Sequence, residues 1–278
     1  MIEKRFSWSS TYTWVILILF ALFVLYPFWI GIAGSLKSDK EFFRLPAFYP
    51  PVHFTLTSYK KAWAEVLGPM WFTLRIALMT MVLSVVFGTI GGYLLAHTRF
   101  PGSRLLFIVL VFGIYIPGVS KLIPVIRVIQ IFGLYNTSFG VSLAISSIQL
   151  PLTTILYRQY FLQFPKSLFE VAEISGADHL QVLRYIVVPL ASIPTATVAI
   201  LAVSAGWNDL LFPLVLISGR VQVVTTAITG LIYEAERYSL FNKLLAGTII
   251  VTIPVTVLYL LFQGRITTGF RQMGEGVK

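Results

Sequence analysis

Six long apolar stretches constrain this chain more than any other feature of its sequence. Each contains about 20 residues, which is the length that an α-helix needs to cross the roughly 30 Å hydrocarbon core of a bilayer. Because lipid offers no hydrogen-bond partners, such stretches must pair their own backbone groups and therefore form helices. The predicted spans cover residues 14–34, 71–96, 105–124, 138–161, 189–216 and 244–262. We predict an all-α, polytopic membrane protein with six transmembrane helices.

The composition agrees with one membrane domain. Hydrophobic residues make up 57% of the chain and charged residues 12%, against roughly 25% charged residues in soluble domains. The spans occupy most of the length, so residues 1–278 are expected to form a single transmembrane domain without a separate enzyme domain. The first span lacks a small-residue cleavage site and is expected to remain as an anchor. The absence of cysteine from the sequence excludes disulfides and thiolate metal sites.

The net charge of +10 does not indicate a nucleic-acid partner. The basic residues are scattered over loops and helix ends, where cations meet lipid headgroups, and they form no dense tract. Lysine and arginine divide almost equally between the two sides of the six predicted spans, so the positive-inside rule is nearly neutral. The short loop at residues 99–104 and the basic N-terminus favour both termini on the cytoplasmic side.

A polar loop at residues 164–188, between the fourth and fifth spans, is predicted to form a hairpin of two short helices. Ser167 and Glu170 have the spacing of a capping box, in which each side chain bonds the other residue's backbone N–H. The first helix is expected to end just before Gly176, because glycine suits the left-handed position after a helix C-terminus. Asp178 opens the second helix. A hairpin of this kind is not needed to cross a bilayer, so we expect it to dock onto another protein.

The first helix of the hairpin is expected to present one apolar face at helical spacing. That face consists of Leu168, Val171, Ala172 and Ser175. An apolar stripe of Leu180, Leu183 and Val187 is expected on the second helix, and Pro189 is expected to start the next span in its first turn.

The hairpin resembles the EAA loop of ATP-binding-cassette importer permeases, whose pattern is E-A-A-x3-G-x9-I-x-L-P. The match runs from Glu170 through Gly176 to Pro189, and it departs from the pattern at Val171 and Val188. In that family the loop is a coupling helix that sits in a cleft of the cytoplasmic ATPase. The resemblance therefore implies a set of ATPase-coupling residues, which are Ser167, Leu168, Glu170, Val171, Ala172, Gly176 and Ala177.

Two further segments are similar to the maltose-type carbohydrate permeases of the same family. One is residues 35–63, in the long loop at 35–70 that we expect to form a packed outer cap with a helix at 58–67. There the chain departs from the group at Leu74-Arg75, where an Asn-Ser pair is usual. The other is the tail at residues 263–278, which in that group reaches between the ATPase subunits.

The candidate residues of a transport pathway lie within the spans, where polar groups are costly and so point to function. Trp207 and Asn208 resemble a Trp-Asn pair of the sugar permeases; with Asp209 they could hold a sugar by stacking and hydrogen bonds. Pro213 predicts a bend near Asp209. In the alternative interpretation, Trp207 packs between subunits and Asp209 caps a broken helix.

The fourth span carries a second group of polar residues along one helical face. Ser146 and Gln149 share this face with Ser142 and Thr153. The face could line an aqueous pathway, but small hydroxyl residues also hold membrane helices together, and we favour the second interpretation.

No motif predicts catalysis or a cofactor. No lysine follows a glycine, so the phosphate-binding loop of an ATPase is absent from the sequence. The three histidines lie in different regions without metal-ligand spacing, and no serine, histidine and carboxylate can be argued to converge. We predict neither an enzyme nor a metal site, and ATP is expected to be bound by partner subunits.

Together with the resemblance, these observations predict a permease subunit of a bacterial ATP-binding-cassette sugar importer. It is expected to form half of the translocation pathway and to couple ATPase closure to alternating access. The implied partners are a second homologous permease, two ATPase subunits, a soluble substrate-binding protein, the sugar and the lipid membrane, with no nucleic acid. The implied location is the bacterial inner membrane, with several spans and cytoplasmic termini. The alternatives are a permease for peptides or amino acids, and an ion-coupled transporter that uses Asp209.

Overall fold

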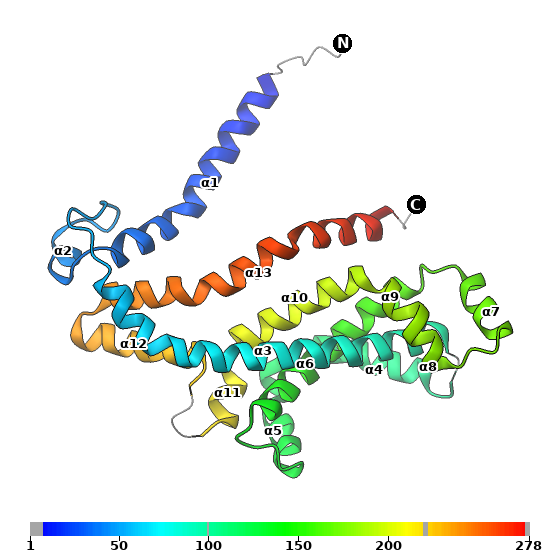
Figure 1. The fold of residues 1–278 in the computed structure, drawn as a ribbon. Helices are drawn as coiled ribbons and strands as arrows, with labels where there is room; N and C mark the ends of the chain where they lie inside the picture. Colours follow the sequence, from blue (N-terminus) through cyan, green and yellow to red (C-terminus); the bar gives the residue numbers. More distant parts are fainter. Residues whose placement is uncertain (1–7, 99, 219–221, 276–278) are drawn as a thin grey trace. The chain divides into compact units, whose positions relative to one another are not determined.

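The computed structural model of the chain describes residues 8–98, 100–218 and 222–275, and within these ranges all regular structure is helical. The fold class predicted from the sequence is confirmed. The elements in chain order are α1 Trp8–Ser35, α2 Asp39–Arg44, α3 Thr57–His97, α4 Ser103–Tyr115, η1 Gly118–Lys121, α5 Leu122–Ile131, α6 Ser138–Phe161, α7 Lys166–Ile174, α8 His179–Val182, η2 Leu183–Val187, α9 Val188–Leu190, α10 Ser192–Asn208, α11 Leu211–Leu216, α12 Val224–Tyr238 and α13 Phe241–Glu275 (Figure 1).

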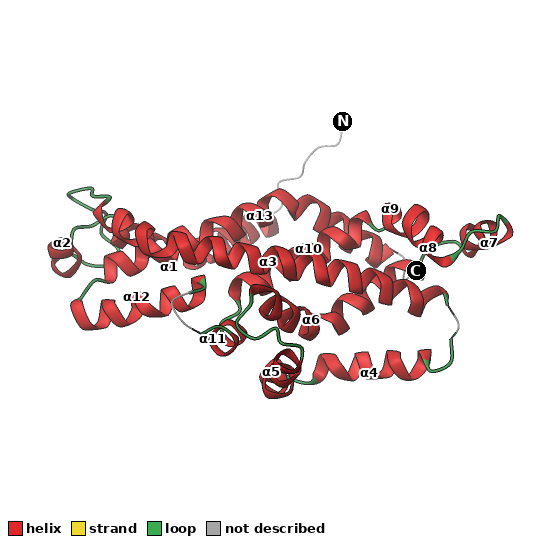
Figure 2. Ribbon diagram, turned by 60° about the horizontal axis from the view of Figure 1, so that its bottom comes forward, coloured by secondary structure: helices red, strands yellow, loops and turns green. Residues whose placement is uncertain are grey.

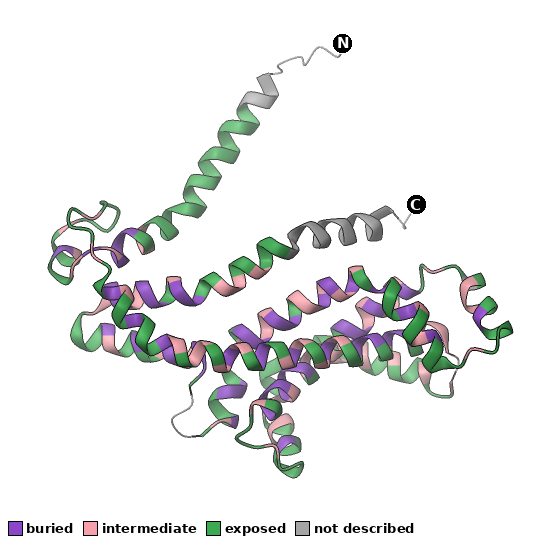
Figure 3. Ribbon diagram, viewed as in Figure 1, coloured by how far each residue is buried: buried purple, intermediate pink, exposed green. Residues whose placement is uncertain are grey.

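Four helical segments are long and apolar enough to cross a membrane, and they are Tyr12–Ser35, Thr57–His97, Ser138–Phe161 and Phe241–Leu261. Two bent helix pairs raise the number of candidate spans to six if each pair counts as one span. The most exposed of the four is α1, in which none of the apolar window is buried inside the structure (Figure 3). A helix that is apolar on all sides and exposed in the isolated chain is typical of a membrane span.

The third predicted span, residues 105–124, is not one straight helix. The helix α4 ends at Tyr115, and the following pair of η1 and α5 is turned by 115° from it. Ile116 has an extended backbone with φ −75° and ψ 120°. The cause is Pro117, because a proline ring disfavours the helical conformation of the residue before it.

The fifth predicted span, residues 189–216, is broken twice. Its main helix, α10, begins at Ser192 rather than at Pro189, after a bend of 79°. The helix ends at Asn208, and Asp209 is extended before the short helix α11. The bend that Pro213 predicts near Asp209 is therefore a complete interruption of the helix.

The chain divides into two compact units: the part up to Leu67 with Ala227–Thr252, and Gly68–Thr226 with the part from Ile253. In the first unit the loop after α1 is packed, as the sequence predicts. The buried Lys37 Nζ donates to the Pro46 carbonyl at 3.0 Å. Lys243 Nζ lies 2.5 Å from a Glu65 carboxylate oxygen and 2.6 Å from one of Glu234.

One prediction for this region needs correction. The expected helix at 58–67 is not separate, because it is the first part of α3, which continues through Pro69 to His97. The helix α12 was not predicted, because it is amphipathic and too short to be recognised as a membrane span. The last residues of the predicted tail, 276–278, lie outside the described residues.

Within the second unit, α3 closely approaches both α6 and α10 (Figure 2). A Cβ added to Gly92 of α3 would lie 2.5 Å from the Tyr157 Cβ and 2.9 Å from the Arg158 backbone nitrogen, both on α6. A Cβ on Gly206 of α10 would lie 2.7 Å from the Ala77 Cα on α3. Glycine at these contacts lets the backbones approach closely, as is common between membrane helices.

We expect Gly92→Ala to destabilise the protein, because the added methyl group meets backbone atoms that cannot move independently. Overpacking of this kind costs roughly 1–3 kcal/mol. The matched control is Gly68→Ala on the same helix, where an added Cβ meets nothing within 4 Å. That control should hold or raise the melting temperature of the purified protein in detergent. Equal melting temperatures for the two variants would show that the α3–α6 contact is not tight.

Candidate functional site

The first helix of the hairpin, α7, does not use the predicted capping box. It begins at Lys166, directly after Pro165, and no side chain caps its N-terminus. The Leu168 N–H donates to the Pro165 carbonyl at 3.1 Å. Because the helix starts after the proline, Ser167 falls inside the first turn, where its hydroxyl cannot act as an N-cap. The capping prediction for Ser167 and Glu170 is wrong.

The end of α7 agrees with the sequence. Gly176 has φ +77°, a left-handed conformation that favours glycine. The Ala177 N–H donates to the Ala172 carbonyl at 3.0 Å and the Gly176 N–H to the Glu173 carbonyl at 2.9 Å. This pair of bonds is a Schellman motif, which satisfies the last carbonyl groups of the helix and turns the chain back.

The capping box of the hairpin lies one helix later than predicted. The Gln181 N–H donates to Asp178 Oδ1 at 2.7 Å, and the Asp178 N–H donates to Gln181 Oε1 at 2.9 Å. The second helix then widens into the π-turn η2, which leads to Pro189. Pro189 has no backbone N–H, so it interrupts the regular hydrogen-bond ladder of the helix. A π-turn just before the proline is consistent with this interruption. Hydrogen bonds therefore fix the end of α7 and the start of α8.

The predicted docking face of α7 is divided by the structure. Ala172 is buried in a cluster with Tyr93, Tyr157 and Val182, and Leu168 is half-buried. Val171 is 62% exposed, and Ile174, which the sequence did not single out, is 87% exposed. Residues 171 and 172 are about 100° apart on a helix, and in this structure Ala172 faces the interior while Val171 faces outward.

The side of α7 that remains available to a partner is hereafter called the outward face. It consists of Ser167, Glu170, Val171 and Ile174, all of which are exposed. Two exposed aliphatic side chains beside a carboxylate are typical of a surface that another protein covers. The sequence could have indicated Ile174 as part of this face, because it lies one helical turn after Glu170.

Trp207, Asn208 and Asp209 lie together at the end of α10 but in different surroundings. Trp207 is 4% exposed, while Asn208 is exposed and donates its Nδ2 to the Ser204 carbonyl at 2.8 Å. Asp209 Oδ1 accepts the Phe212 N–H at 2.9 Å, and the Asp209 carbonyl accepts the Thr225 hydroxyl at 2.9 Å. The Asp209 carboxylate thus caps the start of α11. This agrees with the alternative interpretation, in which Asp209 caps a broken helix.

Ser146 and Gln149 lie on α6, and both belong to its polar face. The Ser146 hydroxyl is buried, lies 2.6 Å from the Ser142 carbonyl, and contacts the Thr80 carbonyl of α3 at 3.3 Å. Gln149 Oε1 is buried and has no hydrogen-bond partner among the described residues. Ser146 therefore joins two helices, whereas Gln149 has acceptor capacity left for water or a ligand.

Trp207 and Asn208 are expected to respond differently to truncation. Trp207→Ala removes a buried aromatic side chain and should cost several kcal/mol, within the roughly 3–5 kcal/mol of such core truncations. Asn208→Ala removes an exposed amide and should leave the melting temperature in detergent within about 2 °C of the wild type. A large melting loss for Asn208→Ala would contradict its placement outside the packed core.

The turn at Gly176 predicts a second pair of variants. Gly176→Ala should weaken the hairpin by roughly 1–2 kcal/mol, because a Cβ is unfavourable in the left-handed region. Gly176→Asn should cost less, since asparagine tolerates that region. The measurement is the rate of tryptic cleavage at the exposed Arg184 in the hairpin, which rises with the population of the open form. Equal cleavage rates for Ala, Asn and the wild type would exclude a strained turn.

Comparison with known proteins identifies a family for this chain. The family described as "Binding-protein-dependent transport system inner membrane component" matches residues 84–272. The diacetylchitobiose uptake system permease protein of Streptomyces coelicolor is 28% identical over 97% of this chain and 89% of its own length. The trehalose transport system permease protein of Mycobacterium tuberculosis is 32% identical over 71% of this chain and 72% of its own. A crystal structure of a bacterial ABC transporter that imports alginate matches with a TM-score of 0.79 and 25% identity, over 93% of this chain and 98% of the other.

Proposed function

Because the chain belongs to the family of binding-protein-dependent transport system inner membrane components, we propose that it forms half of the translocation pathway of a sugar importer. The family comprises membrane subunits of ATP-binding-cassette importers, so this chain is a permease and not an enzyme. Hydrolysis of ATP belongs to a separate ATPase subunit. Sugar as substrate is supported by the names of the relatives, which transport diacetylchitobiose and trehalose.

The family implies an ATPase and a substrate-binding protein as partners. We propose in addition a second, homologous permease and two ATPase subunits, the assembly that the maltose-type resemblance implies. We also propose that both termini are cytoplasmic, since this orientation brings the α7–α8 hairpin to the side of the ATPase. ATP would then be bound by the ATPase subunits, and this chain would need no cofactor of its own.

The observation that carries the proposal is the way the hairpin is built. Its outward face is exposed, while its inward side is fixed to the rest of the second unit. Ala172 of α7 and Val182 of α8 share one buried cluster with Tyr93 of α3, Tyr157 of α6 and Val198 of α10. Displacement of the hairpin must therefore displace three long helices, because packed side chains transmit strain.

This connection suggests how ATP-driven closure would move the permease. The ATPase would hold the outward face of α7, and the hairpin would carry the motion into α3, α6 and α10 as one packed body. Rigid-body rocking of packed helices is a common form of such transitions. The left-handed turn at Gly176 and the capping box at Asp178 stabilise the hairpin, so that it would transmit this motion without bending.

The pathway residues are proposed from their position and exposure. Asn208 is exposed and polar, so we propose it as the contact for sugar hydroxyls. Trp207 and Asp209 serve the fold of the broken helix first, by burial and by capping. Ser146 holds α6 to α3, and Gln149 keeps an unused acceptor that water or substrate could meet.

Glu170→Ala tests the outward face directly. Since Glu170 makes no cap, the variant should keep the wild-type melting temperature while its capture of the ATPase weakens by about tenfold, which corresponds to loss of one charge-assisted hydrogen bond. The control is Glu236→Ala, an exposed glutamate of α12. Unchanged capture of the ATPase and unchanged transport by Glu170→Ala would contradict the docking role.

Uptake by vesicles that contain the whole complex separates this function from ion-coupled transport. Depletion of ATP inside the vesicle should abolish uptake of the sugar, and collapse of ion gradients should spare it. An ion-coupled carrier that uses Asp209 would show the opposite pattern. A complex that takes up peptides or amino acids instead of sugars would leave the importer assignment in place and change the substrate class.

A further inference from the structure

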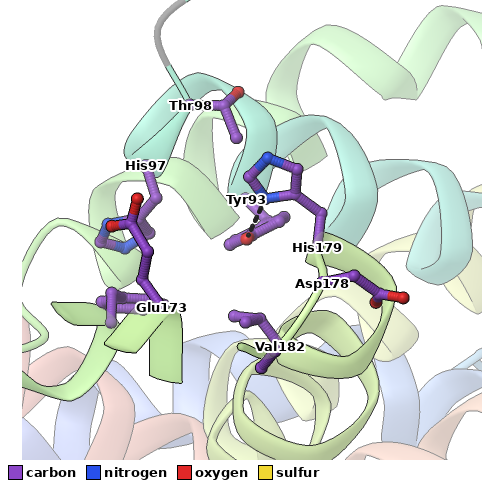
Figure 4. Close-up of a pocket in the computed structure, with 9 residues that line it drawn as sticks. Tyr93, His97, Thr98, Glu173, Asp178, His179 and Val182 are labelled. Carbon is purple, nitrogen blue, oxygen red and sulfur yellow. Dashed lines mark hydrogen bonds between the residues drawn. The ribbon is translucent and has the colours of Figure 1, made fainter. Parts of the chain in front are cut away.

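A pocket of about 440 Å³ lies between the end of α3 and the α7–α8 hairpin (Figure 4). Its lining includes Tyr93 and His97 from α3, Phe169 and Glu173 from α7, and Asp178 beside α8. The pocket lies within the second unit, and its wall is formed in part by the hairpin that we assign to the ATPase. None of the functions proposed above uses it.

The inner walls of this pocket are aromatic. The His97 ring stacks on the Phe169 ring with centroids 3.8 Å apart, and the Tyr93 ring centroid lies 6.0 Å from that of His97. His97 is fixed by a hydrogen bond between its Nε2 and the Phe161 carbonyl at 3.0 Å. The Tyr93 hydroxyl lies 3.2 Å from the Nδ1 atom of His179. These contacts hold flat ring surfaces in place without a ligand.

The rim of the pocket is acidic. Glu173 and Asp178 are both exposed lining residues. The Glu173 carboxylate lies on the side of the His97 ring, whereas the Asp178 carboxylate lies on the opposite side and points away from the other labelled side chains (Figure 4). Asp178 uses one oxygen to cap α8. Among the residues found to line the pocket there is no lysine or arginine. The ion pairs in the described part of the chain involve Lys243 and lie in the other unit.

We propose that this pocket receives an arginine side chain of the ATPase subunit. A guanidinium is planar, so it stacks on aromatic rings while its edges bond carboxylates, and it sheds water more readily than an ammonium group. Aromatic walls with the Glu173 carboxylate beside the His97 ring match this chemistry (Figure 4). The ATPase is the source because the same hairpin supplies Phe169, Glu173 and Asp178; the inference therefore rests on the proposed function.

The first experiment compares affinities of the assembled permease for its ATPase. Glu173→Gln keeps the side-chain size and removes the charge, and we expect the dissociation constant to rise about tenfold. Asp178→Asn should have a smaller effect, because the Asp178 carboxylate points away from the pocket and asparagine, a good N-cap, keeps the cap of α8 (Figure 4). Glu236→Gln, which removes an exposed carboxylate of α12, should leave the affinity unchanged.

The second experiment uses the absence of cysteine from the chain. Thr98→Cys places a single thiol at the edge of the pocket with both carboxylates intact. A reagent that carries a maleimide and a phenylglyoxal joins a thiol to a nearby arginine. In the whole complex, mass spectrometry should identify a cross-link from this thiol to an arginine of the ATPase. Thr57→Cys, at the first residue of α3, is the control and should give none.

The outcomes separate this inference from the proposed function. If Glu170→Ala weakens ATPase binding while Glu173→Gln does not and no arginine is cross-linked, the pocket assignment is overturned and the coupling role stands. If neither variant affects binding, the coupling role fails as well. If free L-arginine raises the melting temperature of the permease alone, but not that of Glu173→Gln, and ATPase affinity is unaffected, the pocket binds a soluble cation and the ATPase is not its source.

Discussion

The packing of a short hairpin onto three long helices is the interaction on which the rest of this structure depends. Ala172 and Val182 of the hairpin are buried in that contact, in one cluster with Tyr93 of α3 and Tyr157 of α6. The cluster is possible only because α3 and α6 approach closely at Gly92, where no side chain separates the backbones. A hairpin held in this way cannot move alone. Its outward face is then both the place where a partner can bind and the start of a continuous packed path into the membrane-spanning part of the chain.

Polar groups inside the second unit show how the helices accept this arrangement. The hydroxyls of Ser142 and Ser146 lie within hydrogen-bond distance of carbonyls of α3, and so they join two helices without ion pairs. Buried atoms of Thr80, Ser84 and Gln149 have no partner among the described residues. An unpaired polar atom costs roughly 1–3 kcal/mol in a protein interior. In native proteins most buried polar atoms bond to the protein or to ordered water, so these three atoms are the places in the second unit where water or a ligand would be stabilised.

Much of this arrangement could be predicted from the sequence, and the failures have local causes. Long apolar runs determine spans, and a glycine at position 176 determines a left-handed turn, because each depends on one strong physical preference. The start of α7 was predicted wrongly because two signals competed: Ser167 has cap chemistry, but Pro165 starts the helix two residues earlier. The breaks after Tyr115 and at Asp209 were harder, since hydropathy does not distinguish a straight span from a bent one. Which side of α7 faces inward depends on the position of Tyr93, far away in the sequence, and no local pattern contains that information.

Hydrogen–deuterium exchange of the complete transporter tests the central claim most directly. The amides of residues 167–177 should exchange several-fold more slowly when the ATPase is bound than in the permease alone, while amides of α12 remain unchanged. That result would show that the ATPase holds the outward face of α7 and stabilises the hairpin behind it. Equal exchange in the hairpin with and without bound ATPase would contradict the account, because coupling would then have to pass through another part of the chain.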